Sequence, residues 1–335
     1  MLYVKQNKVL NEKGEKVRLY GVNICGLEWD SKGYRIIESV NEAFKNWNCN
    51  LIRLPLSQDR WFGKAEEQAD AGESYRKIVG DVIKIASESG KYIDIDLHWS
   101  NMGEWGKNIS QHYMPDMLSI DFWIDIAKRY ANNPAVLFGL YNEPHDISWK
   151  VWRDGGKVDE IINKGKEDEA IVSYETPGHQ RLINEIRKTG AKNIIIAGGI
   201  DWAYDLRGIA KNTTTGECYA LDDPQGNGII YDSHIYTIKE HDGVNHDTKV
   251  LCITQDHPVL IGEIGISNRE GEYGAANRPT WLADMCNWMD KHDLHWTGWC
   301  FHPSAGPCMI LDWDYNPTSY HGAILKERLL SYANL

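Results

Sequence analysis

Short apolar runs recur along the chain and alternate with longer segments of helical periodicity. Eight of these runs have the length and the aliphatic or aromatic content of strands that are buried on both faces. The runs cover residues 18–26, 51–57, 92–99, 136–144, 193–201, 229–236, 258–265 and 296–301. Apolar residues at the three- and four-residue spacing of amphipathic helices occur between them, in residues 39–48, 74–90, 120–134, 178–190 and 278–293.

This alternation of strand and helix predicts an α/β fold, a (β/α)8 TIM barrel. Residues 2–19 are expected to form a short N-terminal β-hairpin, with a turn near Gly14, that closes the bottom of the barrel. No Pro-rich linker, charge block or low-complexity segment divides the sequence. We therefore expect a single catalytic domain over residues 1–335.

Polar and aromatic residues concentrate at the carboxyl ends of the eight runs. In a barrel of this kind, the active site lies at that end of the strands. The strand-end residues are Asn23, Arg53, His98, Trp99, Asn142, Glu143, Asp201, Trp202, His234, Tyr236, Glu263 and Trp299. Their common position predicts one pocket at the mouth of the barrel.

Two glutamates stand out among these residues. Glu143 follows the apolar run 136–141, and a carboxylate in such a place is costly unless it is paired or used. Glu263 ends the seventh run, so both side chains are expected to face the same pocket. Two carboxylates that flank one bond, one protonated and one ionised, are the equipment of glycoside hydrolysis.

Several short motifs follow one another in a characteristic order over nearly the whole chain. They are IRLP, DLHW, YNEP, HIY, an apolar run that ends in GE, and GW in the last strand. In this order they resemble glycoside hydrolase family 5, the cellulase-type retaining β-glycanases of the TIM-barrel clan. The resemblance implies that Glu143 is the acid/base and Glu263 the nucleophile. Retention of configuration then requires the two carboxyl groups to lie about 5–5.5 Å apart.

The same resemblance assigns supporting roles to residues around the pair. It implies that Asn142 binds the sugar 2-hydroxyl and that Arg53 keeps Glu263 ionised. Tyr236 would donate a hydrogen bond to the nucleophile.

Three further residues receive substrate-binding roles from the resemblance. His234 would bind substrate and tune the acid/base pair, and His98 would contact sugar hydroxyls in the same subsite. Trp299 would form the floor of the −1 subsite.

The aromatic composition points to a sugar-binding surface, because the chain has 14 Trp and 17 Tyr but only 5 Phe. Trp and Tyr combine an apolar ring with a polar tip and suit wet, concave clefts. The candidate stacking platforms are Trp29, Trp99, Trp105, Trp149, Trp152 and Trp202. Several platforms favour an open groove and an endo-acting enzyme.

The sequence thus favours an endo-β-1,4-glucanase that hydrolyses β-glucan by double displacement. A β-mannanase, a xylanase or a xyloglucanase of the same family stays open, since loops decide which backbone is bound. A non-catalytic carbohydrate-binding barrel is the alternative from another class. That alternative predicts the loss of one glutamate, and both are present.

Other function classes find little support. The net charge of −12 argues against a nucleic-acid partner, and no stretch approaches the ~20 apolar residues of a membrane span. No metal is expected, because the strand-end histidines each match a sugar-contact position and residues 241–247 (HDGVNHD) are interpreted as a solvated loop. No GxGxxG motif follows a strand, so no dinucleotide and no other cofactor is expected.

Location and assembly are predicted only in outline. We expect a monomer that acts on a β-linked polysaccharide or oligosaccharide outside the cell, with the signal peptide absent from this chain; a cytoplasmic location stays open. Among the seven cysteines, Cys300 and Cys308 are near enough in sequence for a loop disulfide, which the sequence does not decide.

Overall fold

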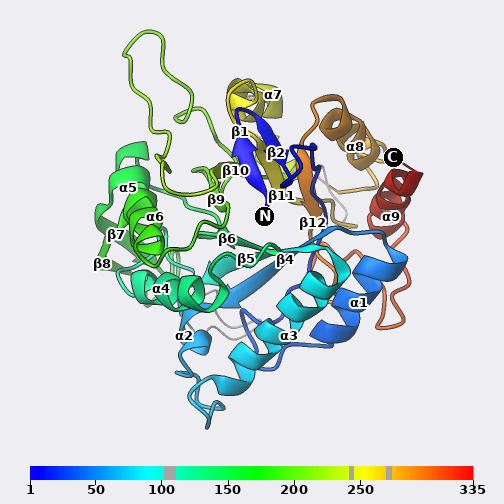
Figure 1. The fold of residues 1–335 in the computed structure, drawn as a ribbon, viewed down its shortest axis with the longest axis horizontal. Coiled ribbons are helices and arrows are strands. Elements are labelled where there is room, and N and C mark those ends of the chain that lie inside the picture. Colours follow the sequence, from blue (N-terminus) through cyan, green and yellow to red (C-terminus); the bar gives the residue numbers. More distant parts are fainter. Residues whose placement is uncertain (102–110, 241–244, 269–273, 335) are drawn as a thin grey trace.

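Eight parallel strands close into a barrel in the computed structural model, which describes residues 1–101, 111–240, 245–268 and 274–334 (Figure 1). Around the barrel the strand order is β10–β11–β12–β3–β4–β5–β6–β9. Their bounds are β3 Tyr20–Asn23, β4 Leu51–Ser57, β5 Tyr92–Trp99, β6 Val136–Gly139, β9 Ile195–Gly198, β10 Ile229–Tyr236, β11 Val259–Gly265 and β12 His295–Gly298. Seven of the predicted runs contain one of these strands and the eighth overlaps β12, so the barrel prediction is confirmed.

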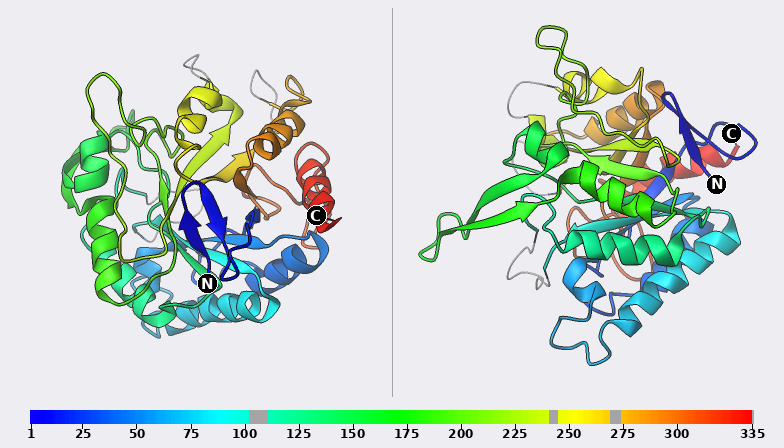
Figure 2. Two further views of the ribbon diagram at one scale, coloured as in Figure 1. Left: turned by 45° about the horizontal axis from the view of Figure 1, so that its top comes forward. Right: turned by 60° about the vertical axis from the view of Figure 1, so that its left-hand side comes forward.

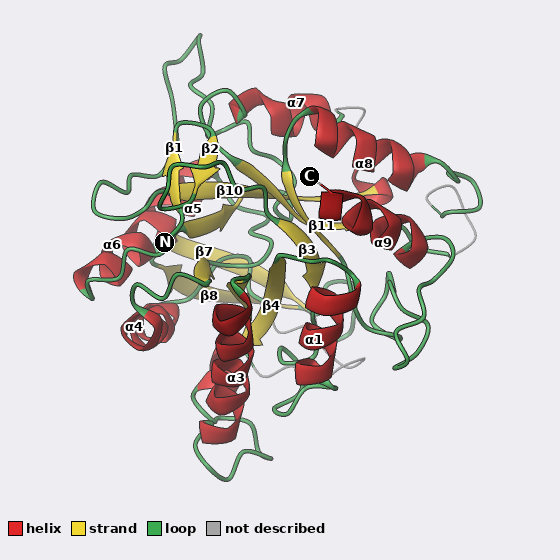
Figure 3. Cartoon of the chain, turned by 45° about the vertical axis from the view of Figure 1, so that its right-hand side comes forward, coloured by secondary structure: helices red, strands yellow, loops and turns green. Residues whose placement is uncertain are grey.

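Helices surround the barrel, as the red ribbons outside the yellow strands show (Figure 3). The longer ones are α1 Ile36–Asn46, α3 Glu73–Ser89, α4 Ser119–Tyr130, α6 Gly178–Lys188, α8 Trp281–Lys291 and α9 Gly322–Ser331. The short ones are α2 Gln58–Trp61, α5 Trp149–Asp154, α7 His246–Val250 and the 3-10 turns η1 Thr237–Glu240, η2 Leu251–Ile253 and η3 Tyr332–Asn334. The five predicted helices are present, and α9 adds a further one.

Helix α3 illustrates how the pattern produces the packing. Tyr75, Val79, Val82 and Ile83 recur at three- and four-residue spacing and are all buried against the barrel. The helix ends at Gly90, whose φ of 64° lies in the left-handed region that glycine adopts without steric cost.

An N-terminal hairpin covers the bottom of the barrel, as predicted (Figure 2, left). Strand β1 (Tyr3–Lys5) pairs with β2 (Lys8–Leu10), so the turn lies at residues 6–7. The predicted turn position near Gly14 is wrong for this hairpin, because Gly14 belongs to a second turn that ends at the Leu10–Lys16 bridge. Apolar side chains of the hairpin and of the lower strand ends form one buried cluster, of Leu2, Val9, Leu19, Leu51, Leu137, Ile194, Ile196, Ile230 and Leu260.

A second hairpin was not expected from the sequence. Strands β7 (Gly156–Ile162) and β8 (Ala170–Thr176) pair antiparallel in the connection that follows β6. This hairpin projects from the barrel (Figure 2, right). Its side chains contact residues 112–114 in the connection between β5 and α4, which makes the hairpin relevant to the site described below.

All seven cysteines lie in the described part of the chain and are free thiols. A Cys300–Cys308 disulfide is therefore not formed, and Cys300 Sγ lies 3.2 Å from Cys25 Sγ. Among the described residues, no helix has the length and apolar character needed to cross a bilayer.

Candidate active site

Glu263 lies in β11 with both carboxylate oxygens hydrogen-bonded. Arg53 donates from Nη1 to Oε1 at 2.8 Å, and the Tyr236 hydroxyl donates to Oε2 at 2.6 Å. Burial and the neighbouring Glu263 charge raise the pKa of Tyr236 well above its ordinary value, so the hydroxyl keeps its proton and remains a donor. Both oxygens of this buried carboxylate thus accept a hydrogen bond, one of them from a cation.

Glu143 lies beyond the last residue of β6, at the end of a segment that continues the strand direction. Leu140 donates its N–H to the carbonyl of Ile196, and Asn142 donates its N–H to the carbonyl of Leu97. The Glu143 backbone then enters the left-handed region with a φ of 49°. Such a conformation is costly for a non-glycine residue and is found where the surroundings over-determine it, often at functional sites.

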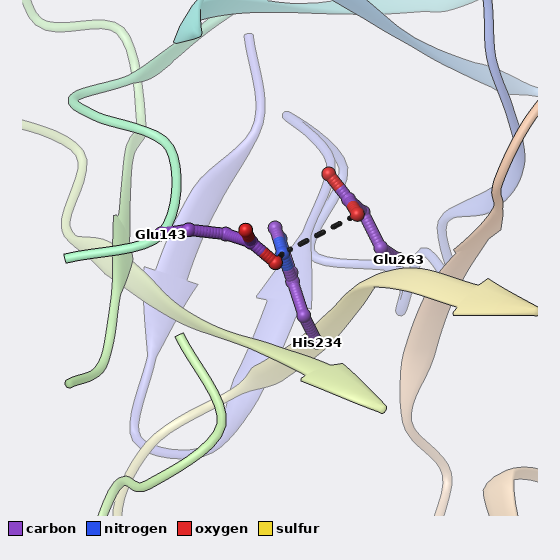
Figure 4. Close-up of side chains that lie close together, drawn as sticks. All are labelled: Glu143, His234 and Glu263. Carbon is purple, nitrogen blue, oxygen red and sulfur yellow. Dashed lines mark hydrogen bonds and ion pairs between the residues drawn. The ribbon is translucent and has the colours of Figure 1, made fainter. Parts of the chain in front are cut away.

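His234 connects Glu143 to the interior of the barrel (Figure 4). Its Nδ1 lies 2.9 Å from Glu143 Oε1 and 3.6 Å from Glu263 Oε2, while its Nε2 lies 3.1 Å from Asp232 Oδ2. Both ring nitrogens therefore face carboxylates, and only an imidazolium can donate from both.

The protonation of this pair follows from its neighbours. Burial alone would lower the pKa of His234, but Glu263, Asp232 and Glu143 raise it to about 9. Burial also opposes ionisation of Glu143, but Lys239, 3.6 Å from Oε1, and His234 hold its pKa below the usual range. In the free enzyme, one proton is thus held on His234 Nδ1, within hydrogen-bond distance of Glu143.

The two glutamates lie close together. A carboxylate oxygen of Glu143, a ring nitrogen of His234 and a carboxylate oxygen of Glu263 all lie within 4.8 Å of one another. This agrees with the short carboxyl separation expected of a retaining glycosidase rather than the ~6.5–9.5 Å of an inverting one. The same three groups have the residue types of a metal site, but the adjacent Arg53 and Lys239 charges disfavour a divalent cation there.

Arg53 is the centre of a buried charge network. Besides Glu263, it contacts the Asn142 and Asn23 side-chain oxygens at 2.8 and 3.0 Å and Asp96 Oδ2 at 3.0 Å. The side chain is 2% exposed. Burial acts against its charge, but the surrounding carboxylates raise its pKa further above the usual range, so Arg53 stays cationic.

A glycine next to Glu263 makes room for a second buried carboxylate. Gly262 donates its N–H to Asp232 Oδ1 at 2.7 Å, and a Cβ at this position would lie 2.4 Å from the same oxygen. Any larger residue before Glu263 would therefore displace Asp232, the carboxylate that faces His234 Nε2.

The structure brings the predicted sugar-contact residues to the same mouth. His98 Nδ1 lies 2.7 Å from Asp96 Oδ2, and its ring stacks on Trp299 with centroids 5.3 Å apart and an interplanar angle of 10°. Trp29 and Trp99 are each only 6% exposed and pack in one cluster against Cys25, Cys300 and Ala305. Because they are buried, these two tryptophans support Trp299, which packs against the same cluster.

Among the predicted tryptophans that the structure describes, Trp202 is the exposed one, with 42% of its surface accessible. One ring face stacks on His145 at 4.5 Å and an interplanar angle of 11°. Its backbone contacts the Glu143 side of the site: the Trp202 N–H donates to the Pro144 carbonyl, and Lys239 Nζ donates to the Trp202 carbonyl at 2.5 Å. Trp105 and His241 lie outside the described residues.

Sequence reasoning missed several side chains that hold this site. They are Gln111, which contacts Asn142, together with Asp94, Asp96, Asp232 and Lys239. A signal for the aspartates existed in the Ile-Asp-Ile-Asp alternation of residues 93–96, because acidic residues inside an apolar strand need a buried partner. Gln111 and Lys239 had no such signal.

Comparison with known proteins supports one family. The family model described as "Cellulase (glycosyl hydrolase family 5)" matches residues 10–305. Cellulase CelDZ1 of Thermoanaerobacterium sp is 24% identical over 95% of this chain and 77% of its own length. Endoglucanase C of Evansella cellulosilytica is 25% identical over 88% of this chain, which spans only 35% of that relative.

A solved structure shows the same fold. The β-glucanase SdGluc5_26A of Saccharophagus degradans, crystallised in complex with cellotetraose, superposes with a TM-score of 0.75 at 22% identity, covering 99% of this chain and 93% of that one. With the family-model match over most of its length, the chain belongs to the cellulase family, glycosyl hydrolase family 5.

Proposed function

We propose that this protein is a retaining, endo-acting hydrolase of β-1,4-linked glucan, with Glu263 as nucleophile and Glu143 as acid/base. The observation that supports it most directly is the pair of carboxylates within 4.8 Å in unlike surroundings. Glu263 is held by Arg53 and Tyr236, which suit an ionised nucleophile. Glu143 is hydrogen-bonded to the protonated His234, an arrangement that suits a residue that donates a proton to the leaving group.

In the first step, Glu263 attacks the anomeric carbon while the bond from that carbon to the leaving oxygen breaks. The proton on His234 Nδ1, 2.9 Å away, passes to Glu143 and from there to the leaving oxygen, which leaves Glu143 ionised and His234 neutral. The glycosyl ester that forms removes the negative charge of Glu263. Since that charge raises the pKa of His234, its loss lowers the proton affinity of the His234–Glu143 pair.

In the second step, Glu143 is ionised and can therefore act as a base. Glu143 accepts a proton from water, the water oxygen attacks the anomeric carbon, and Glu263 leaves as a carboxylate. Asn142, held by Arg53 through its Oδ1, keeps its amide nitrogen for the sugar 2-hydroxyl. The His98 Nδ1–H donates a hydrogen bond to Asp96, so Nε2 can bind another sugar hydroxyl. Trp299, which stacks on His98, lies below the sugar ring.

The substrate assignment draws on the relatives. Several are described as endoglucanases, and the β-glucanase structure holds a cello-oligosaccharide. We extend this to the present chain as one catalytic unit over residues 1–335 that acts as a monomer. A polymeric glucan substrate implies action outside the cell.

The test is release of reducing sugar from a cellulose derivative, mixed-linkage glucan, xyloglucan, mannan and xylan, with Glu263→Gln as control. We expect the highest activity on a β-glucan, retention of the anomeric configuration in the first product seen by NMR, and a loss of at least about 10⁴-fold in the variant. Activity on mannan or xylan alone would correct the backbone. Full activity of Glu263→Gln would refute the mechanism.

A further inference from the structure

Gln111 makes a three-point contact with the segment that ends in the acid/base. Its Oε1 accepts a hydrogen bond from Asn142 Nδ2 at 2.9 Å. Its Nε2 donates to the backbone carbonyls of Asn142 at 2.8 Å and of Glu143 at 3.0 Å. One amide side chain therefore binds both functional residues of the Asn-Glu pair.

The contact with Asn142 determines how that amide is oriented. Arg53 donates to Asn142 Oδ1, and Gln111 accepts one of the two Nδ2 hydrogens, so a flipped amide would break both bonds. The second Nδ2 hydrogen remains available for a substrate hydroxyl. Gln111 thus helps present Asn142 as a donor rather than an acceptor.

The contact with the two carbonyls acts on the backbone. Glu143 has a φ of 49°, a conformation that a non-glycine residue keeps only when neighbouring groups hold it. Gln111 Nε2 donates to the carbonyls of the two peptide groups that flank the Glu143 Cα. It therefore opposes relaxation of this turn, which would move the Glu143 carboxyl away from His234.

The β7–β8 hairpin in turn supports the segment that contains Gln111. Glu160 of β7 contacts His112 Nδ1 at 2.8 Å and is only 6% exposed. The Tyr174 hydroxyl of β8 lies 2.9 Å from Met114 N and 3.0 Å from Met114 O. The residues after Gln111 are thus attached to the two strands of the hairpin at two points.

We propose that Gln111, supported by the β7–β8 hairpin, is a positioning residue that sets the orientation of Asn142 and the Glu143 carboxyl for proton donation. This rests on the proposed role of Glu143 as the acid. A misplaced acid slows the departure of poor leaving groups, which need the proton, more than that of good ones, which leave as anions.

The experiment compares Gln111→Met, of similar volume, with the unmodified enzyme on phenyl and 2,4-dinitrophenyl β-cellobioside. In both cases kcat/KM reports the step in which the aryl group leaves. We expect a loss of about 10–100-fold on the phenyl substrate and a loss at least about tenfold smaller on the dinitrophenyl one. Glu160→Gln, which weakens the His112 contact, should give a smaller change in the same direction.

Gln180→Met is the matched control. Gln180 makes a similar amide contact with the backbone of Asp222, accepting at 2.8 Å and donating at 2.9 Å, on the outside of helix α6. We expect it to leave both substrates unchanged. If Gln111→Met does not fold, as judged by its melting temperature, Gln111→Ala replaces it.

The outcomes separate this proposal from the proposed function. If the unmodified enzyme hydrolyses neither cellobioside, the function and the role of Gln111 are both refuted. If it hydrolyses both, but Gln111→Met loses equally on the two substrates or not at all, only the positioning role is refuted.

Discussion

The two ends of the same barrel are built from opposite kinds of side chains. At the lower ends of the strands, Leu51, Leu137 and Leu260 pack under the N-terminal hairpin in a cluster of apolar residues. At the upper ends, Arg53 and the carboxylates around it are equally buried but charged. Burial by itself therefore does not distinguish the end that stabilises the fold from the end that performs the chemistry.

The difference lies in what burial costs at each end. An apolar side chain gains free energy when it leaves water, whereas a charge loses hydration that only well-placed partners restore. The upper end is thus stable only as a complete network, and a single missing member leaves the others uncompensated. Substitutions at the two ends should accordingly differ in kind as well as in size.

Arg53→Met should give the largest effect, because it leaves Asp94, Asp96 and Glu263 together without their shared cation. We expect a loss of about 3–5 kcal/mol in the free energy of unfolding and a loss of activity of at least about a hundredfold. Urea unfolding and hydrolysis of a soluble β-glucan measure the two quantities. A variant as stable as the unmodified protein would contradict the network interpretation.

Leu260→Ala tests the lower end. Leu260 is fully buried in the cluster below the barrel, so its truncation should cost about 2–5 kcal/mol of unfolding free energy. The kcat of the folded variant should stay within about twofold, because no charged member of the site is altered. A fall in kcat similar to that of Arg53→Met would erase the distinction between the two ends.

The pH dependence of stability provides a third test. The pKa of His234 is raised from 6.5 to about 9, so its stabilising contribution is complete below pH 6.5 and is lost as the pH rises to 9. A change of this size is worth at most about 3 kcal/mol. Unfolding free energies measured between pH 6.5 and 9 should therefore fall less steeply in His234→Gln, and an unchanged slope would contradict the assigned imidazolium.

Trp202→Ala should show the smallest effect. Its ring is partly exposed at the rim, and aromatic stacking contacts are worth about 0.5–1.5 kcal/mol, so kcat/KM on β-glucan should fall about 2–10-fold. The matched variant is Trp149→Ala, because Trp149 packs against Trp152 and Tyr219. Trp149→Ala should lower the melting temperature without lowering kcat/KM. If kcat/KM falls in Trp149→Ala and not in Trp202→Ala, Trp202 does not contact the substrate.

The sequence predicts the barrel and the strand-end residues well, for a physical reason. Polar residues such as Asn142, Glu143 and His234 interrupt or end apolar runs, and such interruptions are visible without a structure. Asp94 and Asp96 were visible as acidic residues inside an apolar strand, but their partner was not, because both faces of a barrel strand are buried and the pattern does not reveal which side chains meet.

The β7–β8 hairpin and Gln111 could not be predicted in the same way. Residues 156–176 are rich in Lys, Glu and Asp, a composition typical of a solvated loop, and the pairing depends on contacts such as that of Glu160 with His112. Gln111 is one polar residue in a long loop. Its partners lie about 30 residues further along the chain, and only the fold brings them together.

The contact between Gly262 and Asp232 has a consequence for moving this chemistry to another protein. The parallel register of β10 and β11 shifts between Ser233 and His234, just beyond Asp232 and beside Gly262 and Glu263. A graft of Glu143 and Glu263 alone onto an unrelated barrel would encounter a regular ladder and a Cβ where the Asp232 carboxylate must lie. A functional graft must therefore also include a glycine before Glu263, which leaves room for Asp232, and the shifted register of β10 and β11.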